Sequence, residues 1–367
     1  MVRVSFFIAC FLQVVIVGAQ VRTEIKIPDI LGYKTLKCDF HMHTVFSDGD
    51  VWPTIRVQEA WEDGLDVISI TDHIEYRPHS QDIKGNHNRS FEIAEPLAKQ
   101  LGIILIRGAE ITRGMPPGHL NAIFIKNANL LERETWIEAC KEAQAQGAFV
   151  FWDHPGWKVQ QPNITKWWPE HTALLDEGIL KGVEVFNFNE YYPEAIVWAG
   201  QKSLTVFANS DVHASIYATY RHYSRPVTLV FSTGRSEDAI KQALNDRRTA
   251  AYFGDTIVGD QRFLTPIFLN SIEVENYQGT LKNQAEISIR VRNKSDLTFY
   301  LQKRQPSVGF TSQEKIVLPA NKTVTINIEG TSVEVAQVKT LRLFYEVKNL
   351  ITLKNESLHV NIDVPNK

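Results

Sequence analysis

The chain has 367 residues, of which 44% are hydrophobic and 22% are charged, and its formal net charge is −3. A chain of this length and composition can bury a large core, and its length predicts two or three domains. Proteins that bind nucleic acid need clustered positive charge, and no block of Lys and Arg stands out here. The composition therefore argues against a nucleic-acid-binding surface and is typical of a near-neutral soluble protein.

The first 19 residues have the pattern of a secretory signal peptide. Arg3 provides the positive charge, residues 5–17 are apolar except for Gln13, and Val17-Gly18-Ala19 offers small residues for cleavage. This apolar run is shorter than the roughly 20 residues that a spanning helix needs, and no later stretch has the composition of a membrane span. We therefore expect a mature chain without a membrane span, exported to the periplasm or secreted, that begins with an N-terminal extension at 20–35.

Apolar strands alternate with helical patterns through the first two thirds of the chain. Because strands that alternate with helices form parallel sheets covered by helices, this region is predicted to be an α/β domain over residues 36–264. In such folds the loops that bear ligands gather at the carboxyl ends of the strands. Strands are predicted at 36–43, 66–72, 103–111, 120–125, 148–153, 182–188, 204–210 and 227–231, and helices at 53–63, 91–100, 132–146, 194–202 and 237–248.

The pattern changes after residue 265. Short segments that alternate polar and apolar residues, with turn residues between them, are typical of antiparallel strands. We predict that residues 265–367 form an all-β sandwich of about seven strands, similar in pattern to an Ig-like domain. The predicted strands lie at 271–277, 285–292, 298–303, 323–328, 340–347 and 357–364.

Two histidines at the end of the first predicted strand have the spacing of metal ligands. Alternate side chains of an extended chain share a face, so His41 and His43 can bind one cation while Phe40 and Met42 pack into the core. Imidazole and carboxylate ligands without thiolates suit zinc, manganese or iron. Further candidate ligands lie at or just beyond the ends of later apolar runs: Asp48, Asp72, His73, Glu110, His119, His154, Asp211 and His213.

These segments resemble, in order, the signatures of the PHP (polymerase and histidinol phosphatase) family. The resemblance spans residues 36–260 and is nearest to the stand-alone branch that includes histidinol-phosphatase-like and carbaryl-hydrolase-like enzymes. It implies a distorted (β/α)7 barrel, similar to a TIM barrel, with a site for two or three divalent metals. The motifs are Asp39-Phe-His41-Met-His43, Ser47-Asp48-Gly49, Thr71-Asp72-His73, Gly108-Ala-Glu110, Asp153-His154-Pro155 and Ser210-Asp211-Val-His213.

The resemblance also implies how the ligands are shared among three metals. His41, His43 and Asp211 would bind the first metal, and Glu110 would bridge it to the second. His119 and His154 would hold the second metal, and Asp48, His73 and His213 the third. Asp39 and Asp72, each next to a ligand, are expected to fix imidazole tautomers from a second shell; the alternative for Asp72 is a strand-end cap.

Candidate residues for the chemistry follow from this metal site. A water that bridges two metals loses a proton near neutral pH, and the resulting hydroxide is the expected nucleophile, with Glu110 as the bridging ligand. His222, Asp48 or a metal-bound water are the candidates for protonating the leaving group. Arg113 and Arg221 are candidates for binding a phosphate, with surface salt bridges as the alternative.

Two further features lie outside the motifs. The aromatic stretch from Trp157 to Trp168 is expected to pack within its own loop, with a pocket wall as the alternative. His79, His87 and His171 lie in polar segments and are expected to be exposed.

The sequence thus predicts a metal-dependent hydrolase, most simply a phosphoesterase that acts on a small phosphate ester. Because the same chemistry attacks carbonyl carbon, an ester, carbamate or lactone hydrolase is the first alternative. A metal-bound binding protein without catalysis is the second alternative.

Overall fold

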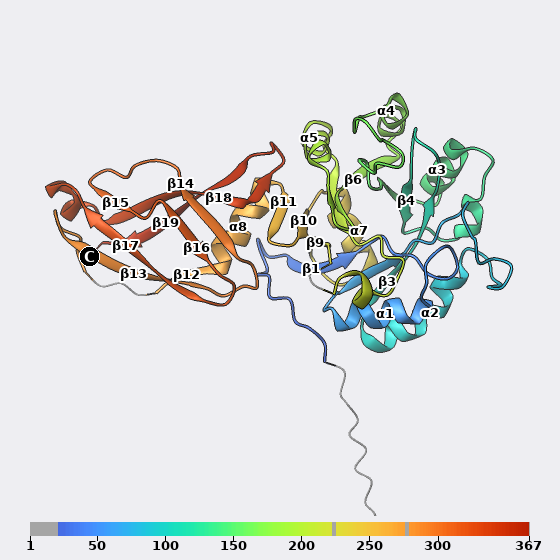
Figure 1. The fold of residues 1–367 in the computed structure, drawn as a ribbon, viewed down its shortest axis with the longest axis horizontal. Helices are drawn as coiled ribbons and strands as arrows, with labels where there is room; N and C mark the ends of the chain where they lie inside the picture. Colours follow the sequence, from blue (N-terminus) through green and yellow to red (C-terminus); the bar gives the residue numbers. More distant parts are fainter. Residues whose placement is uncertain (1–20, 222–224, 276–278, 367) are drawn as a thin grey trace, which may run out of the picture.

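The computed structural model describes residues 21–221, 225–275 and 279–366. The predicted signal peptide and His222 lie outside these residues. No helix in the described ranges is long and apolar enough to cross a membrane. Figure 1 shows two bodies of structure, an α/β barrel and a β-sandwich, with helix α8 between them.

The first body is the predicted distorted barrel of seven strands. Its strands follow the order β1-β2-β3-β4-β5-β6-β8, and the bridge between Met42 and Val212 joins its two ends. The bounds are β1 Lys34–Asp39, β2 Val67–Ile70, β3 Ile104–Ile111, β4 Leu120–Ile123, β5 Phe149–Trp152, β6 Leu180–Asn187 and β8 Thr205–Asn209, and the two-residue strand β7 Glu190–Tyr191 pairs with the end of β6.

The barrel is not wholly parallel, which differs from the prediction. Strand β4 runs antiparallel to both β3 and β5. Only residues 112–119 connect β3 to β4, and a parallel pair needs a crossover of about a dozen residues or more. The missing helical pattern between these two strands was the available signal for this reversal.

Helices cover the outside of the barrel, and their ends follow local sequence rules. Pro53 starts α1, and Thr135 and Glu138 form a capping box at the start of α3.

His171 lies in α4, a helix the sequence did not predict, and is fully buried against the ring of Trp152, so its predicted exposure is wrong. The helices are α1 Pro53–Glu62, α2 Arg89–Leu101, α3 Trp136–Ala145, α4 Pro169–Asp176, α5 Pro193–Lys202, α6 Ile216–Thr219, α7 Glu237–Asn245 and α8 Gln261–Ser271, with 3-10 turns at Ala128–Leu131 and Val333–Gln337.

Two four-stranded antiparallel sheets form the sandwich. One sheet has the order β12-β13-β17-β15, and in the other β14 pairs with β16 and β18, while β18 pairs with β19. Alternating burial along these strands produced the sequence pattern, for instance in β13 and β17. The bounds are β12 Ile272–Val274, β13 Glu286–Asn293, β14 Phe299–Lys303, β15 Phe310–Ser312, β16 Lys315–Leu318, β17 Thr323–Gly330, β18 Thr340–Thr352 and β19 Ser357–Pro365.

The sheets of the two bodies are continuous. Strands β9 (Val227–Ser232), β10 (Thr249–Phe253) and β11 (Thr256–Gly259) extend from β1 as an antiparallel ribbon, and β11 then pairs in parallel with β18. Helix α8 packs beneath this junction, and the predicted boundary between residues 264 and 265 falls within it. Pro266 inside the helix and the short apolar run around it hid α8 from the sequence analysis.

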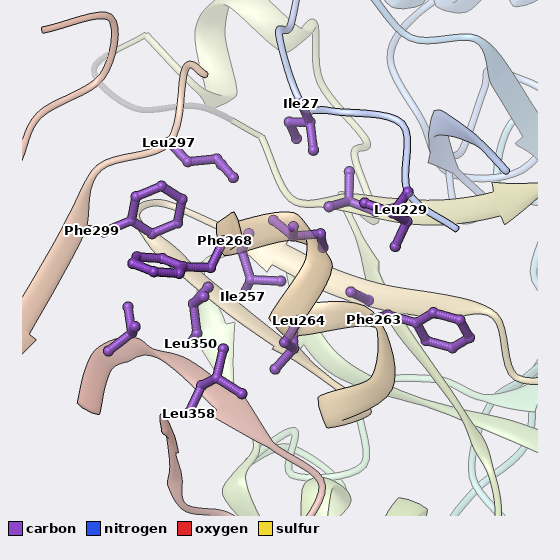
Figure 2. Close-up of a cluster of buried hydrophobic side chains, with 14 of the residues drawn as sticks. Ile27, Leu229, Ile257, Phe263, Leu264, Phe268, Leu297, Phe299, Leu350 and Leu358 are labelled. Atoms are coloured by element: carbon purple, nitrogen blue, oxygen red, sulfur yellow. The ribbon is translucent and has the colours of Figure 1, made fainter. Parts of the chain in front are cut away.

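One hydrophobic cluster fills the junction. Figure 2 shows Phe263, Leu264 and Phe268 of α8 between residues of the ribbon beside the barrel, such as Leu229 of β9, and sandwich residues such as Phe299. The rings of Phe268 and Phe299 meet edge to face, with centroids 5.1 Å apart. Because both bodies share this core, they should unfold together.

We predict that Phe268→Ala lowers the free energy of unfolding by roughly 3 to 5 kcal/mol, because it removes a fully buried ring from the shared core. Differential scanning calorimetry should show one transition before and after the substitution. Leu269→Ala is the matched control, because Leu269 follows on the same helix and is 46% exposed. Two separate transitions, or equal losses from both substitutions, would contradict a shared core.

Candidate metal centre

The centre begins where β1 continues past its last residue. The backbone stays extended here because Met42 bridges Val212, and the His43 N–H donates to the carbonyl of Val212 at 3.1 Å. Phe40 and Met42 are fully buried in core clusters, as predicted. The imidazoles of His41 and His43 therefore both point to the other face, and both are also fully buried.

The first group of ligand atoms matches the predicted first metal. Asp211 Oδ1 lies 3.1 Å from His41 Nε2 and 3.0 Å from His43 Nε2. Glu110 Oε2 lies 3.0 Å from the same His41 nitrogen and 3.2 Å from the His43 nitrogen. Four donor atoms from three separate segments thus face one point.

Glu110 has its second oxygen in another group. Its Oε1 lies 2.5 Å from Nδ1 of His119 and 3.3 Å from Nδ1 of His73. The two oxygens of one carboxylate therefore face two groups, as expected of a bridging ligand.

The position of His154 differs from the prediction. Its Nε2 is 4.0 Å from Asp211 Oδ2, and its ring centroid is 4.9 Å from that of His119. His73 rather than His154 completes the second group.

The third group surrounds Asp48. Its Oδ1 lies 3.3 Å from Nε2 of His73 and 3.3 Å from Nε2 of His213, and 3.8 Å from Nδ1 of His43. These are the three residues predicted for a third metal, with His43 joining them. All nine predicted ligands are thus gathered at one end of the barrel.

The donor atoms fit divalent cations. Glu110 Oε1, His119 Nδ1 and Asp48 Oδ1 are buried without a hydrogen-bond partner among the described residues, although other donor and acceptor atoms lie within 3.3 Å. Buried polar atoms are normally paired, so lone pairs that converge without hydrogen-bond geometry indicate a shared cation. The nitrogen and oxygen set suits zinc, manganese or iron.

The carboxylates and imidazoles of the centre shift one another's pKa values. Burial raises the pKa of Glu110, but the imidazoles of His73 and His119 outweigh burial and hold that pKa well below its usual range. Burial lowers the pKa of His73, but the Glu110 and Asp48 carboxylates outweigh it and raise the pKa to about 11. Burial lowers the pKa of His154 to about 3, so this imidazole is neutral and free to bind a metal.

Two ligands occupy the left-handed region of backbone conformation. Asp211 has φ 49° and His154 has φ 29°. Non-glycine residues in this region carry strain, which native structures keep where the surroundings fix the backbone. Here Asp211 N–H donates to the His41 carbonyl at 2.9 Å, and His154 N–H donates to a Glu184 oxygen at 2.7 Å.

Asp39 and Asp72 support the backbone rather than imidazole rings, which corrects their predicted role. Asp39 accepts from the N–H groups of His41 and Ser210, each at 3.2 Å, and pairs with Arg225. Asp72 accepts from the Thr44 N–H at 2.6 Å and from the Ser47 hydroxyl at 2.9 Å. Asp72 thereby holds the turn that presents Asp48.

The residue that orients an imidazole is Glu184, which the sequence analysis missed. It is fully buried on β6, and its Oε1 lies 3.0 Å from Nδ1 of His41. Asn187 and Asn209 donate to the same carboxylate at 2.7 and 2.9 Å. This arrangement turns the Nε2 of His41 toward the metal position. A glutamate within the apolar strand Leu180–Asn187 was the signal that pointed to it.

Asp153 belongs to the motif Asp153-His154-Pro155, but the sequence alone predicted no role for it. It is fully buried, both its oxygens lack a hydrogen-bond partner among the described residues, and burial raises its pKa well above the usual range. A carboxylate oxygen of Asp153 lies close to donor atoms of His41 and Glu110, so the three residues form one further group. The structure thus adds a further possible metal ligand beside the first group.

The predicted phosphate-binding arginines lie elsewhere. Arg113 pairs with Glu75 at 2.8 Å and donates to the carbonyls of Arg133 and Glu134, which is the salt-bridge alternative. Arg221 lines a separate cavity between α1 and α6 rather than the metal centre. His222 lies outside the described residues, so its predicted role stays a prediction.

A cavity of about 590 Å³ opens onto His154, Asp211 and His213, three of the predicted ligands. Trp157 lines it, with its ring centroid 5.2 Å from that of His154. Trp167, in contrast, packs edge to face against Trp152, so the aromatic stretch contributes both to the cavity wall and to packing. The cavity is of the size that binds small molecules.

Comparison with known structures identifies the family. A solved structure from Bacteroides vulgatus, a two-domain protein containing a predicted PHP-like metal-dependent phosphoesterase, is 45% identical with a TM-score of 0.89, and the match covers 95% of this chain and 100% of that chain. The chain belongs to the PHP family. The model of an Ig-like domain family, DUF5001, matches residues 271–363, in agreement with the sandwich.

Two other proteins are less similar. A 5'-3' exoribonuclease of Haemophilus influenzae is 37% identical over 78 residues, which are 21% of this chain, and the chain spans about a quarter of that protein's length (24%). The Lactococcus lactis histidinol phosphate phosphatase, solved with zinc, L-histidinol and phosphate, is 16% identical, with a TM-score of 0.30 and coverage of 56% and 93%. Family membership and the ligand groups together indicate a PHP-type metal-dependent hydrolase.

We predict that Glu184→Leu lowers the affinity for Mn²⁺ by about 10- to 100-fold, because His41 loses the partner that orients it. Isothermal titration calorimetry with metal-free protein measures this affinity. Glu194→Leu, at an exposed position on α5, is the control and should bind as the wild type does. Equal affinities for wild type and the Glu184 variant would contradict the orienting role.

Metal binding should also release protons. Burial lowers the pKa values of His41 and His73, but the neighbouring carboxylates outweigh burial and hold both values above the usual range in the metal-free protein. These imidazoles therefore carry protons at pH 7 that a metal must displace. Apparent affinity should therefore rise as pH rises from 6 to 8. Calorimetry in buffers of different ionisation enthalpy counts the released protons, and a count of zero would contradict this description.

Proposed function

We propose that this protein is a phosphoesterase that hydrolyses a small phosphate ester with divalent metals bound at the described centre. The observation that carries the proposal is Glu110, whose two oxygens face separate groups of imidazoles and so hold two cation positions side by side. Adjacent cation positions suit a phosphate, which offers several oxygens to neutralise. Membership of the PHP family supports the same reaction.

Bound metals would lower the pKa of water and neutralise charge on the phosphate in the transition state. Hydrolysis forms a phosphorus–oxygen bond from water, breaks the ester bond and returns a proton to the alcohol. The protein positions the ligands through Glu184 and Asp72 and admits the ester through the cavity beside His154 and Asp211. Burial raises the pKa of Asp48, but the neighbouring imidazoles of His213 and His73 outweigh it and hold that pKa low, so Asp48 is suited to be a ligand rather than the proton donor.

The proposed place of action is outside the cytoplasm. The support is the pattern of residues 1–19, in which a positive charge precedes an apolar run and small residues. Detection of a chain starting near Gln20 by N-terminal sequencing of the exported protein would test this part of the proposal.

Activity should depend on Glu110. With saturating Mn²⁺ or Zn²⁺, the wild type should hydrolyse 4-nitrophenyl phosphate, and Glu110→Gln should lower kcat/KM by about a thousandfold or more, because two cation positions lose a charged ligand. Glu132→Gln is the control, since the Glu132 side chain is 73% exposed. Parallel assays with 4-nitrophenyl acetate separate the reaction types, and hydrolysis of the acetate alone would overturn the phosphoesterase proposal in favour of a carbonyl ester hydrolase.

A further inference from the structure

A second cavity, of about 620 Å³, lies where the N-terminal segment, the barrel and the sandwich meet. Its wall includes Thr23 from the N-terminal segment, parts of α1 and α6 from the barrel, Tyr252 from β10 and Asp296 from the loop between β13 and β14. None of the nine predicted metal ligands, all of which are described, lines it. The cavity is therefore distinct from the metal centre, and it is of the size that binds small molecules.

Negative charge prevails in the wall of this cavity. Among the described residues, five carboxylates and two guanidinium groups line it. Glu62 on α1 accepts a hydrogen bond from the Gln58 amide at 3.1 Å. Asp296 accepts from the Lys26 N–H and from the Asn321 amide, each at 2.6 Å. These donors are neutral, and no salt bridge to either carboxylate occurs in the described part of the chain, so the wall favours a cation over an anion.

Tyrosine rings and aliphatic side chains share the wall with these carboxylates. Burial raises the pKa of Tyr252 to about 12, with the charge of Asp296 contributing, so the phenol stays neutral. Tyr217 on α6 is 73% exposed, and the guanidinium of Arg221 lies over its ring, 5.8 Å from the centroid. Ile55 on α1 is 40% exposed. Carboxylates combined with accessible rings bind organic cations through ion pairing and cation–π attraction, and the apolar surface can cover the rest of such a ligand.

One residue of the wall holds the segments that carry His41 and Asp211. Arg225 is buried, donates to Asp63 at 3.1 Å and pairs with the carboxylate of Asp39. That carboxylate accepts from the N–H groups of His41 and of Ser210, which precedes Asp211. The cavity wall is thus connected to the first group of metal ligands through two side chains.

A second residue of the wall makes a similar connection. Glu59 accepts from the Arg56 guanidinium at 2.8 Å and from the Ile216 N–H at 2.9 Å. Arg56 is fully buried and donates to the carbonyls of His43 and His213 at 2.8 and 2.6 Å. Groups that line the cavity therefore help to fix the backbone of four metal ligands.

We propose that this cavity binds an organic cation with an apolar body, and that its occupation strengthens metal binding. The cationic group would face Glu62 and Asp296, and the apolar body would cover the exposed side chains of Ile55 and Tyr217. A ligand packed against the wall restrains the residues that anchor the metal-ligand segments, so the two binding events are linked. This inference goes beyond the proposed function and does not depend on the reaction that the metal centre catalyses.

The test uses benzyltrimethylammonium as the cation, because its quaternary nitrogen has no lone pair to offer a metal, and benzyl alcohol as a neutral compound with the same ring. In isothermal titration calorimetry with the full-length, Mn²⁺-loaded protein, the cation should bind about tenfold more tightly than the alcohol or better. Glu62→Gln and Tyr217→Ala should each weaken cation binding by about three- to fivefold. Glu132→Gln, outside the cavity, is the control and should match the wild type.

The link to the metal centre is measured by titrating Mn²⁺ into metal-free protein with and without the saturating cation. The affinity for Mn²⁺ should be about fivefold higher, or more, when the cation is present. An Mn²⁺ affinity that the cation leaves unchanged would overturn this link.

Equal affinities for the cation and the alcohol, or cation binding that neither substitution weakens, would overturn the proposed cation site. Neither titration involves hydrolysis of an ester, so failure of this inference is distinguishable from failure of the proposed phosphoesterase function.

Discussion

The structure depends on a fully buried carboxylate, Glu110, that lies within 3.3 Å of four imidazole nitrogens. A buried charge is costly unless it is paired, and four imidazoles cannot all donate to two oxygens with good geometry. Divalent cations resolve this conflict, because each can accept lone pairs from Glu110 and from its neighbours at once. The barrel serves to bring the strand ends close enough for that sharing.

Supporting contacts around the ligands are as specific as the ligands themselves. Glu184 on β6 turns the His41 ring, and its other oxygen accepts from the backbone of His154. Arg56 is a second example, because it is buried and donates to the carbonyls of His43, Val212 and His213. The segment of His41 and His43 and the segment of Asp211 and His213 are therefore tied to each other by backbone as well as side-chain contacts.

The sandwich is built onto the barrel rather than linked to it. Strand β18 continues the sheet of β11. Leu353, in the turn between β18 and β19, packs against the barrel core. At Gly200 on α5, a Cβ would come within 2.3 Å of the Leu353 carbonyl, so only glycine allows this approach. The sandwich thus packs against α5, the helix that follows the β6–β7 hairpin.

Much of the centre could be predicted because its residues follow simple periodicity. His41 and His43 alternate with buried Phe40 and Met42, and the other ligands lie close to the end of an apolar strand, Glu110 within β3 and His119 directly before β4. The way the ligands divide among groups could not be predicted, since the pairing of His119 with His73 rather than His154 depends on where antiparallel β4 places its preceding loop.

Residues whose roles come from tertiary contacts were missed or misplaced. Glu184 gave no signal beyond a charge in an apolar strand, because its partners lie 143 and 25 positions away in the chain. Arg113 follows the strand that carries Glu110, and this position suggested that it binds phosphate. In the structure its guanidinium forms an ion pair with Glu75 instead. Helix α8 was missed because its apolar face packs on two bodies at once, which leaves no clear helical stripe, and because Pro266 interrupts it.

The central claim is that several metals and the phosphate share one centre organised by Glu110. Anomalous-scattering maps from crystals grown with Mn²⁺ and inorganic phosphate test it directly. The account predicts metal peaks on both sides of the Glu110 carboxylate, a further peak beside Asp48, and phosphate density bound to the metals at the mouth of the cavity near His154. A single metal peak, or phosphate bound away from Glu110 at Arg113 or Arg221, would contradict it.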